Sequence, residues 1–262
     1  MAETAKDDTK PSASTAAAEP AIVTAPAKSL QSSKTVIGDL FPELLVEAIG
    51  TFALIFMGVG AIVMTNTASG PNLIAVGLAH GLAIALMVAA AGHISGGAYN
   101  PAVCVALVVA RKLAPLKAVF FIIAELVGAV LAAWLLTTIF PAAMVTAANL
   151  GVPSVGNGFS QQEAFIAEIV TTFFLVYVIF GVAIDKRGPA SIAALCIGLT
   201  ISMDIFATGN VSGAAMNPAR WFGPALVQHS WDNGIIWIAG PLAGALLAAV
   251  VYFYIYLRNQ TD

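Results

Sequence analysis

Charged side chains are scarce in this sequence of 262 residues. Only 10% of the residues are Asp, Glu, Lys or Arg, whereas 59% are hydrophobic. Soluble domains carry about 25% charged residues, so this composition excludes a soluble protein and is typical of a chain that crosses a membrane several times. We therefore expect a lipid bilayer around the chain and no nucleic-acid partner.

Cysteine is also rare. The two cysteines, Cys104 and Cys196, both fall in apolar segments. Two such residues give neither a disulfide framework nor the spacing of a metal site. We interpret them as small buried hydrophobic side chains, and we expect no metal, no cofactor and no enzymatic chemistry.

Residues 1–35 contain mainly Ala, Ser, Thr, Pro and Lys without apolar periodicity, which predicts a disordered N-terminal tail. They have neither the apolar core of a secretory signal nor the arginines of a transit peptide. Residues 36–262 form the second unit. In it, six apolar segments are each close to the ~20 residues that cross a bilayer; they cover about 41–65, 72–92, 115–139, 163–184, 189–208 and 234–257.

Two Asn-Pro-Ala triplets interrupt this pattern. They are Asn100, Pro101 and Ala102 within SGGAYNPA, and Asn217, Pro218 and Ala219 within SGAAMNPAR. Proline is favoured at the first position of a helix, and asparagine at the residue before it. Each triplet therefore predicts a short helix, over about 101–110 and 218–228, that is too short to cross the bilayer and enters it from one side.

The chain repeats internally. Glu47 begins EAIGTFALIFMGVGAI and Glu168 begins EIVTTFFLVYVIFGVAI, and each segment is followed by a second span, a triplet and a third span. The repeats cover about 41–139 and 163–257. Because three spans is an odd number, the second repeat runs inverted in the membrane. The two short helices then meet with their N-termini near the midplane, where inverted repeats form transport sites.

Three polar residues are expected to support these short helices. Glu47 and Glu168 lie early in the first span of each repeat, and carboxylates inside a membrane pair with partners. We expect them to accept hydrogen bonds from the unpaired backbone N–H groups of the two triplet turns, with a proton relay as the alternative. His93, placed in the first re-entrant loop, is expected to bond the loop backbone.

Basic residues predict the orientation of the chain. They precede the first span, follow the first short helix, join the fourth and fifth spans and follow the sixth, at Lys28, Lys34, Arg111, Lys112, Lys117, Lys186, Arg187 and Arg258. These regions fall on one side of a six-span chain, so the positive-inside rule places both termini in the cytoplasm. We expect a multi-pass protein of the cell membrane, with an internal membrane as the alternative in a eukaryotic cell.

Asn100 and Asn217 each carry an amide with two donor hydrogens. If these hydrogens face a shared lumen, they hold a passing water by its oxygen, and with the two positive helix ends they interrupt proton hopping. Simple helix capping is the alternative. Arg220 is the only Lys or Arg in the loops of the opposite side. Because an Arg at membrane depth costs at least ~2.5–3.5 kcal/mol, we expect it to line the pore and repel cations.

Two further titratable residues lie inside predicted spans. His80, taken alone, is interpreted as a satisfied core residue. Asp204 has no balancing charge nearby in the sequence. It faces a vestibule, pairs with a neighbour or is protonated, and the sequence does not choose among these.

On these residues the sequence resembles the aquaporin (major intrinsic protein) family over about residues 40–257. The resemblance rests on GHISGGAYNPAV at 92–103, SGAAMNPARWFGPA at 212–225, the two Glu-led first spans and AGPLAGA at 239–245. It implies an all-α bundle of six transmembrane helices plus two re-entrant half-helices, a homotetramer, and one pore in each subunit.

The resemblance also implies a selectivity filter of four residues on the extracellular side, formed here by His80, Ile205, Ala214 and Arg220. Water channels of the family usually have Phe, His, Cys and Arg there, and glycerol channels have Trp, Gly, Phe and Arg. The set in this chain is similar to that of tonoplast-type plant channels. Ile205 and Ala214 imply a wider and more apolar opening than in a strict water pore.

The leading hypothesis is a passive water channel that excludes protons and ions and admits some small neutral solutes. The alternative is a channel mainly for ammonia, hydrogen peroxide or urea. Trp221 directly after Arg220, and Trp237 in the sixth span, weigh against glycerol. A secondary transporter is a lesser alternative, in which Asp204 is the only unpaired candidate for a coupling charge.

Overall fold

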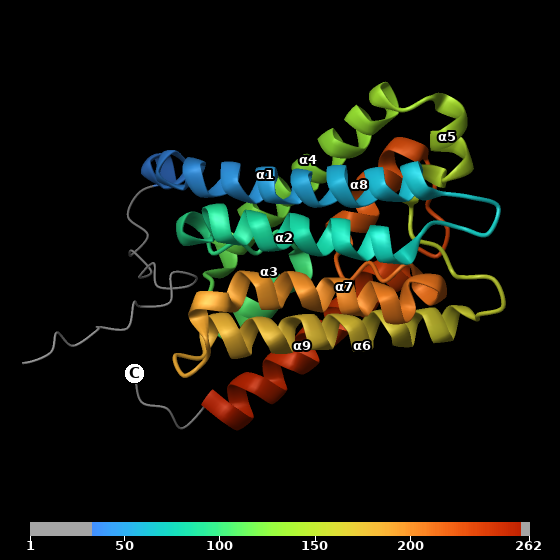
Figure 1. Ribbon diagram of the computed structural model, residues 1–262. Helices are drawn as coiled ribbons and strands as arrows, with labels where there is room; N and C mark the ends of the chain where they lie inside the picture. The colour runs from blue at the N-terminus through green and yellow to red at the C-terminus, as the bar shows by residue number, and fades with distance from the viewer. Residues whose placement is uncertain (1–32, 258–262) are drawn as a thin grey trace, which may run out of the picture.

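The computed structural model describes residues 33–257, and this part of the chain is helical throughout apart from its connecting loops. Six long helices lie side by side (Figure 1). They are α1 (Ser33–Thr65), α2 (Leu73–Ser95), α4 (Pro115–Ile139), α6 (Gln161–Ile179) with its π-helical extension η2 (Phe180–Ile184), α7 (Ala193–Ser212) after the 3-10 turn η3 (Ala190–Ile192), and α9 (Ile235–Ala249) with its π-helical extension η4 (Val250–Leu257).

Each of the six is long and apolar enough to cross a membrane, with a mean hydropathy between 1.9 and 2.5. The predicted boundaries lie within a few residues of the observed ones except at the start of α1, which begins at Ser33 instead of about residue 41. The prediction of an all-α membrane protein with six spans is confirmed. Most of the predicted tail, together with Lys28 and Arg258, lies outside the described residues. The last three residues of the predicted tail, 33–35, already belong to α1.

Two short helices follow the triplets, α3 (Pro101–Val109) and α8 (Pro218–Gln228). The side-chain oxygen of Asn100 accepts the N–H of Ala102, and that of Asn217 accepts the N–H of Ala219, both at 2.9 Å. These caps satisfy donors that a helix start leaves unpaired. The predicted half-helices are therefore present.

Each half-helix packs against a long helix of the other half of the chain. Besides its neighbour α4, α3 packs against α9 of the second half, and α8 packs against α4 of the first half. Two short elements remain, α5 (Ala142–Ala147) and the 3-10 turn η1 (Asn149–Gly151), both in the long loop between α4 and α6.

Glycines allow the long helices to approach closely at equivalent places in both halves. A Cβ atom at Gly128 on α4 would lie 2.1 Å from the carbonyl oxygen of Ala48 on α1. A Cβ atom at Gly244 on α9 would lie 2.2 Å from the carbonyl oxygen of Ile169 on α6. Ala48 follows Glu47 directly, and Ile169 follows Glu168. The helix pairs α1–α4 and α6–α9 are thus equivalent, as expected for an internal repeat.

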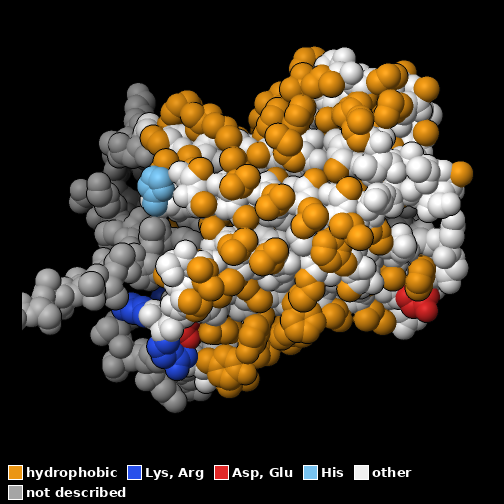
Figure 2. Space-filling model, viewed as in Figure 1, with side chains coloured by type: hydrophobic (Ala, Val, Ile, Leu, Met, Phe, Trp, Pro, Cys, Tyr) orange, Lys and Arg blue, Asp and Glu red, His pale blue; other side chains and the backbone are white. Residues whose placement is uncertain are grey.

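The flank of the bundle is apolar. Large hydrophobic side chains are exposed along the long helices, for example Leu86, Ile123 and Leu199, and Figure 2 shows such side chains spread over the face in view. On this face, Lys and Arg side chains gather at one end (Figure 2). A bilayer covers such a flank, and charges stay at its edges.

Candidate functional site

The loops before the two half-helices have the same backbone conformation. Left-handed φ angles occur at three matching pairs of positions, namely Gly96 (101°) and Gly213 (82°), Gly97 (66°) and Ala214 (44°), and Tyr99 (49°) and Met216 (52°). Ala214 is notable because a side chain at this φ is uncommon. The sequence difference between Gly97 and Ala214 therefore adds a methyl group to the second loop without changing its path.

Glu47 and Glu168 each hold one of these loops. Glu47 accepts the hydroxyl of Ser95 at 2.6 Å and the backbone N–H groups of Ala98 and Tyr99 at 3.2 and 2.7 Å. Both carboxyl groups are fully buried. Three donors on each carboxyl satisfy a charge that is otherwise costly at this depth.

The second loop repeats this arrangement. Glu168 accepts the hydroxyl of Ser212 at 2.7 Å and the N–H groups of Ala215 and Met216 at 2.9 and 2.8 Å. Trp237 supports the same loop, because its indole N–H donates to the carbonyl of Ser212 at 2.9 Å.

The two asparagines reach across the junction between the halves. The amide of Asn100 donates to the carbonyl of Met216 at 2.8 Å, and the amide of Asn217 donates to the carbonyl of Tyr99 at 2.9 Å. The sequence left two alternatives for these amides, hydrogens that face a shared lumen and simple helix capping; the caps are present, and each amide also bonds the opposite loop. One hydrogen of each amide fixes the opposite loop, and the other remains for a molecule beside it.

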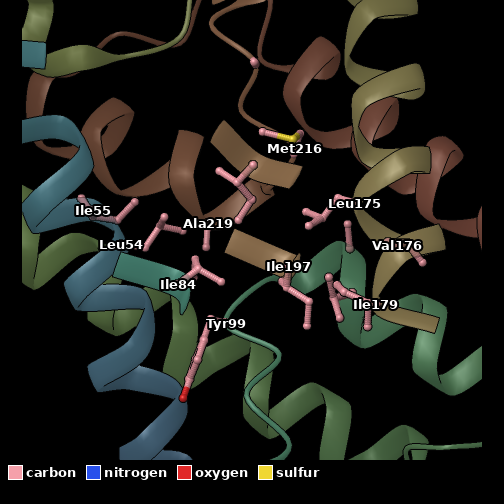
Figure 3. Packing of buried hydrophobic residues seen from close by; sticks show 14 of the residues in the cluster. Leu54, Ile55, Ile84, Tyr99, Leu175, Val176, Ile179, Ile197, Met216 and Ala219 are labelled. Carbon is pink, nitrogen blue, oxygen red and sulfur yellow. The ribbon is translucent and has the colours of Figure 1, made fainter. Parts of the chain in front are cut away.

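A cavity lies at this junction and is bounded by both asparagines and by the two loops. The rest of its wall is largely apolar and comes from several helices, with Leu54, Ile84, Val88, Leu107, Leu175, Ile179, Ile197 and Ile201 among its lining residues. Figure 3 shows several of these side chains around the half-helices. A molecule in the cavity thus meets polar groups along the loops and few elsewhere.

Arg220 lines the same cavity and is 3% exposed. Its Nη1 donates to the carbonyl of Gly151 at 2.8 Å. Asn149, Leu150 and Gly151 all have positive φ, between 45° and 63°, so the chain turns sharply where it offers this carbonyl. The sequence does not reveal the role of the 149–151 turn, because every residue has a backbone carbonyl and no residue type marks this one.

His80 also lines the cavity and is buried. Its Nδ1 lies 2.8 Å from the carbonyl of Val76, so Nδ1 carries the hydrogen and Nε2 is an acceptor. Nε2 has no hydrogen-bond partner within the described part of the chain. Ile205 and Ala214 line the cavity as well, so all four residues of the expected filter border one space.

The structure corrects the predicted place of His93 and narrows the alternatives for Asp204. His93 does not lie in the re-entrant loop, because α2 continues through it to Ser95, and its side chain is exposed. Asp204 is buried in α7, and its Oδ2 has no hydrogen-bond partner in the described chain. Of the three alternatives for Asp204, a paired carboxylate is the least compatible with this environment.

Glu125 on α4 is a functional candidate that the sequence analysis missed. It is fully buried, and its Oε1 accepts the backbone N–H of Asn100 at 2.9 Å. It lies in an apolar span and has no counterpart in the second repeat, so neither the hydropathy nor the repeat pointed to it. Among the described residues, no group of three or more His, Cys, Asp or Glu side chains could hold a metal ion.

Comparison with known proteins places the chain among membrane channels. The model of the major intrinsic protein family matches residues 34–252. A probable aquaporin, TIP3-2 of Arabidopsis thaliana, is 39% identical over 86% of this chain and 87% of that protein. Aquaporin AqpM of Methanothermobacter marburgensis is 37% identical over 82% of this chain and 98% of its own length.

Two further relatives extend this picture. Aquaporin-4 of Mus musculus is 37% identical over 80% of this chain, which spans 66% of that protein. The crystal structure of an aquaglyceroporin from Plasmodium falciparum superposes with a TM-score of 0.73 over 82% of this chain and 96% of the other, at 23% identity. At this identity the superposition shows the shared fold alone.

Proposed function

The chain belongs to the major intrinsic protein family and is a multi-pass membrane channel, not an enzyme; from this premise we propose that it conducts water passively and excludes protons and ions. The proposal rests on Asn100 and Asn217, which border the cavity where the two half-helices meet and whose amides each donate a hydrogen bond to the loop of the other half. Each offers its remaining amide hydrogen to the oxygen of a passing water.

This arrangement favours one orientation of the water at the junction. Two helix N-termini meet there, each carrying roughly half a positive charge. Both the amide hydrogens and the helix ends attract the water oxygen, so its hydrogens point away along the two exits. Because the nearby wall is apolar, the water finds few other partners. A chain of waters with this break cannot relay a proton.

Arg220 supplies the second barrier of the proposed pore. Its guanidinium is fixed by the carbonyl of Gly151, and it borders the cavity together with His80. A fixed positive charge repels cations, and its other N–H groups can bind a passing water. The bond to Gly151 keeps the charge at the wall instead of across the opening.

A second candidate function is conduction of ammonia, hydrogen peroxide or urea. It is favoured by Ile205 and Ala214, which border the cavity with aliphatic side chains. An apolar filter lowers the cost of admitting a neutral solute that makes few hydrogen bonds. A larger polyol such as glycerol needs more room and more hydrogen-bond partners than this aliphatic wall offers, and the bond from Trp237 to the carbonyl of Ser212 holds the second loop in place.

We also propose the orientation and assembly of the channel. Lys117, Lys186 and Arg187 lie at the cytoplasmic side under the positive-inside rule, which places both termini in the cytoplasm of a cell that holds the protein in its plasma membrane. The family resemblance favours a homotetramer with one pore in each subunit.

Stopped-flow light scattering on proteoliposomes tests these proposals. Fast shrinkage in a sucrose gradient, independent of any ion gradient, is the result expected for a water channel, whereas ion-coupled uptake would indicate a transporter. Urea and glycerol gradients, and an internal pH dye for ammonia, separate the two candidate functions. Water flux no faster than in empty liposomes, with rapid ammonia or urea entry, would overturn the first candidate in favour of the second.

A further inference from the structure

Glu125 is a buried acid that the proposed conduction path does not use. It lies in the middle of α4, it is fully buried, and it does not border the cavity. A carboxyl group at this depth is costly unless donors or a proton satisfy it. The hydrogen-bond partners of its two carboxyl oxygens therefore indicate whether Glu125 is ionised or protonated.

The two oxygens of Glu125 have different surroundings. Oε1 accepts two hydrogen bonds, from the N–H of Asn100 at 2.9 Å and from the thiol of Cys104 at 3.3 Å. Oε2 is buried without a hydrogen-bond donor from the described residues. The carboxyl group of Glu47 lies beside that of Glu125, because the two groups accept consecutive backbone N–H groups, Glu47 that of Tyr99 at 2.7 Å and Glu125 that of Asn100 at 2.9 Å.

Both carboxyl oxygens of Glu47, in contrast, have hydrogen-bond donors. Its two oxygens already accept three donors, from Ser95, Ala98 and Tyr99. An ionised carboxylate fits this set, because it only accepts. Between two neighbouring carboxyl groups, the one with the unmatched oxygen is the one that gains most from a proton, since a protonated oxygen becomes a donor to its neighbour.

Charge balance in this region supports the same assignment. Two further acids lie on α1, namely Glu47 beside Glu125 and Glu43 one turn before Glu47. Lys117 forms a salt bridge with Glu43, so its charge is balanced there. Two adjacent carboxylates that share one site cannot both ionise without a large cost.

From this geometry we infer that Glu125 is a neutral carboxylic acid that shares its proton with Glu47 and, as a positioning residue, fixes the start of α3. The Oε2–H group donates to Glu47, and Oε1 accepts the N–H of Asn100. One side chain thereby ties α1 and α4 to the backbone of the residue whose amide holds the opposite loop at Met216.

The second half of the chain is built differently at the equivalent place. Counting three residues back from the equivalent glycines Gly128 and Gly244 gives Glu125 in the first half and Pro241 in the second. Glu168 has the same three kinds of donor as Glu47, but the second half has no acid at the position of Glu125. The first half thus places a second acid beside the glutamate that holds its loop, where the second half has a proline.

Infrared spectroscopy tests the protonation directly, without reference to transport. A neutral carboxylic acid has a carbonyl stretch above the amide I band that shifts in D2O, and exposed acids lose it at mildly alkaline pH. We expect wild-type protein in liposomes to show this band at that pH and Glu125→Gln to lose the component that Glu125 contributes. Asp204→Asn is the matched control, because Asp204 is also a buried acid with an unpartnered oxygen. Asp204→Asn must leave the Glu125 component in place.

A second pair of variants tests the positioning role. Glu125→Leu keeps much of the volume but removes both the acceptor for Asn100 and the donor to Glu47, so we expect water permeability to fall several-fold. Glu125→Gln keeps an acceptor and a donor, so it should restore most of that loss. Glu47→Gln should shift the infrared band of Glu125 without abolishing it, because the acceptor of its proton changes.

The outcomes are separable. An infrared band that is absent in the wild type, or that survives unchanged in Glu125→Gln, would show that Glu125 is ionised and would overturn the inference. Equal water permeability in the Leu and Gln variants would overturn the positioning role. The permeability readout rests on the proposed water conduction, whereas the infrared band does not. A Glu125 band in a protein that conducts no water would therefore refute the proposed function and leave the proton assignment intact.

Discussion

Gly58 on α1 lies directly against the imidazole of His80 on α2: a Cβ atom at Gly58 would lie 2.3 Å from Nε2 of the ring and 2.4 Å from two of its carbons. No side chain other than hydrogen fits at this distance. The imidazole is also held by the bond between Nδ1 and the carbonyl of Val76. Gly58 is therefore what lets His80 lie back against α1 and border the cavity instead of filling it.

We expect Gly58→Ala to reduce water permeability several-fold. The added methyl group overlaps the ring, so the imidazole must move toward the cavity or break its bond to Val76. Gly60→Ala is the matched control on the same helix, because a Cβ atom there would meet its nearest neighbour, a methyl of Leu136, at 3.5 Å, which is ordinary contact. Stopped-flow shrinkage of both variants, normalised to protein content, makes the comparison. Equal rates would show that His80 does not limit the pore.

Arg220→Ala should open the pore to solutes and weaken the cation barrier. The change removes the charge and the bond to Gly151, and it leaves space beside His80. We expect urea entry and proton leak to rise several-fold while water flux persists. A pH dye inside proteoliposomes and a urea gradient measure the two effects. Arg220→Lys keeps the charge, so it should keep the proton barrier better than Arg220→Ala does; leak that is equal in both would contradict a role for the charge.

The sequence was sufficient for the elements that repeat. The Glu-led spans and the two triplets each occur twice, and they predicted six spans, two half-helices and the partners of Glu47 and Glu168 as the structure places them. A hydrophobic run of ~20 residues and a proline at a helix start act locally, so they are visible in a single sequence.

The sequence did not predict functional groups that occur in only one of the two repeats, or that belong to the backbone. Glu125 occurs in one half and sits among apolar residues, so its contact with Asn100 appears only when α4 is placed beside α3. The carbonyl of Gly151 depends on three left-handed residues in a loop. His93 was misplaced because α2 extends to Ser95, and helix ends are set by caps more than by hydropathy.

Mercurials should inhibit the wild-type channel poorly. Cys104 is fully buried against Glu125, and Cys196 on α7 is not among the residues that border the cavity. Ala214 does border it, so Ala214→Cys places a thiol beside the path, and we expect strong inhibition that a reducing thiol reverses. Water flux with and without the mercurial is the measurement. Strong inhibition of the wild type that disappears in Cys104→Ser or Cys196→Ser would contradict the prediction.

Ile205→His should make the filter more selective for water over ammonia and urea. Ile205 presents an aliphatic side chain to the cavity that Arg220 and His80 also border. An imidazole there adds polar atoms and narrows the space, which favours a small solute that forms several hydrogen bonds. We expect the ratio of urea to water permeability to fall several-fold. Ile205→Leu is the control that keeps an apolar side chain, and a fall of the same size in both variants would assign the effect to shape alone.

The stability of the loop that joins α6 to α7 should depend on pH, because Asp185 in this loop is a titratable group with several hydrogen bonds. Its carboxyl accepts the Nε and Nη2 hydrogens of Arg187 at 2.9 and 2.6 Å and the hydroxyl of Tyr252 at 3.2 Å. Hydrogen bonding to Arg187 lowers the pKa of Asp185 below its ordinary value. A lowered pKa stabilises the folded protein above the ordinary pKa of the group, and this contribution is lost as the pH falls through the folded value.

Asp185→Asn should therefore lower the thermal unfolding midpoint at neutral pH, and the difference from the wild type should shrink under acid conditions. Asp185 directly follows Ile184, which borders the cavity, so unfolding of this loop also bears on the mouth of the pore. Asp232→Asn makes the same chemical change at an exposed position in the loop before α9 and serves as the control. Unfolding of detergent-solubilised protein across a pH series is the measurement. If both variants show the same pH-independent shift, the bonds of Asp185 to Arg187 and Tyr252 do not stabilise the loop.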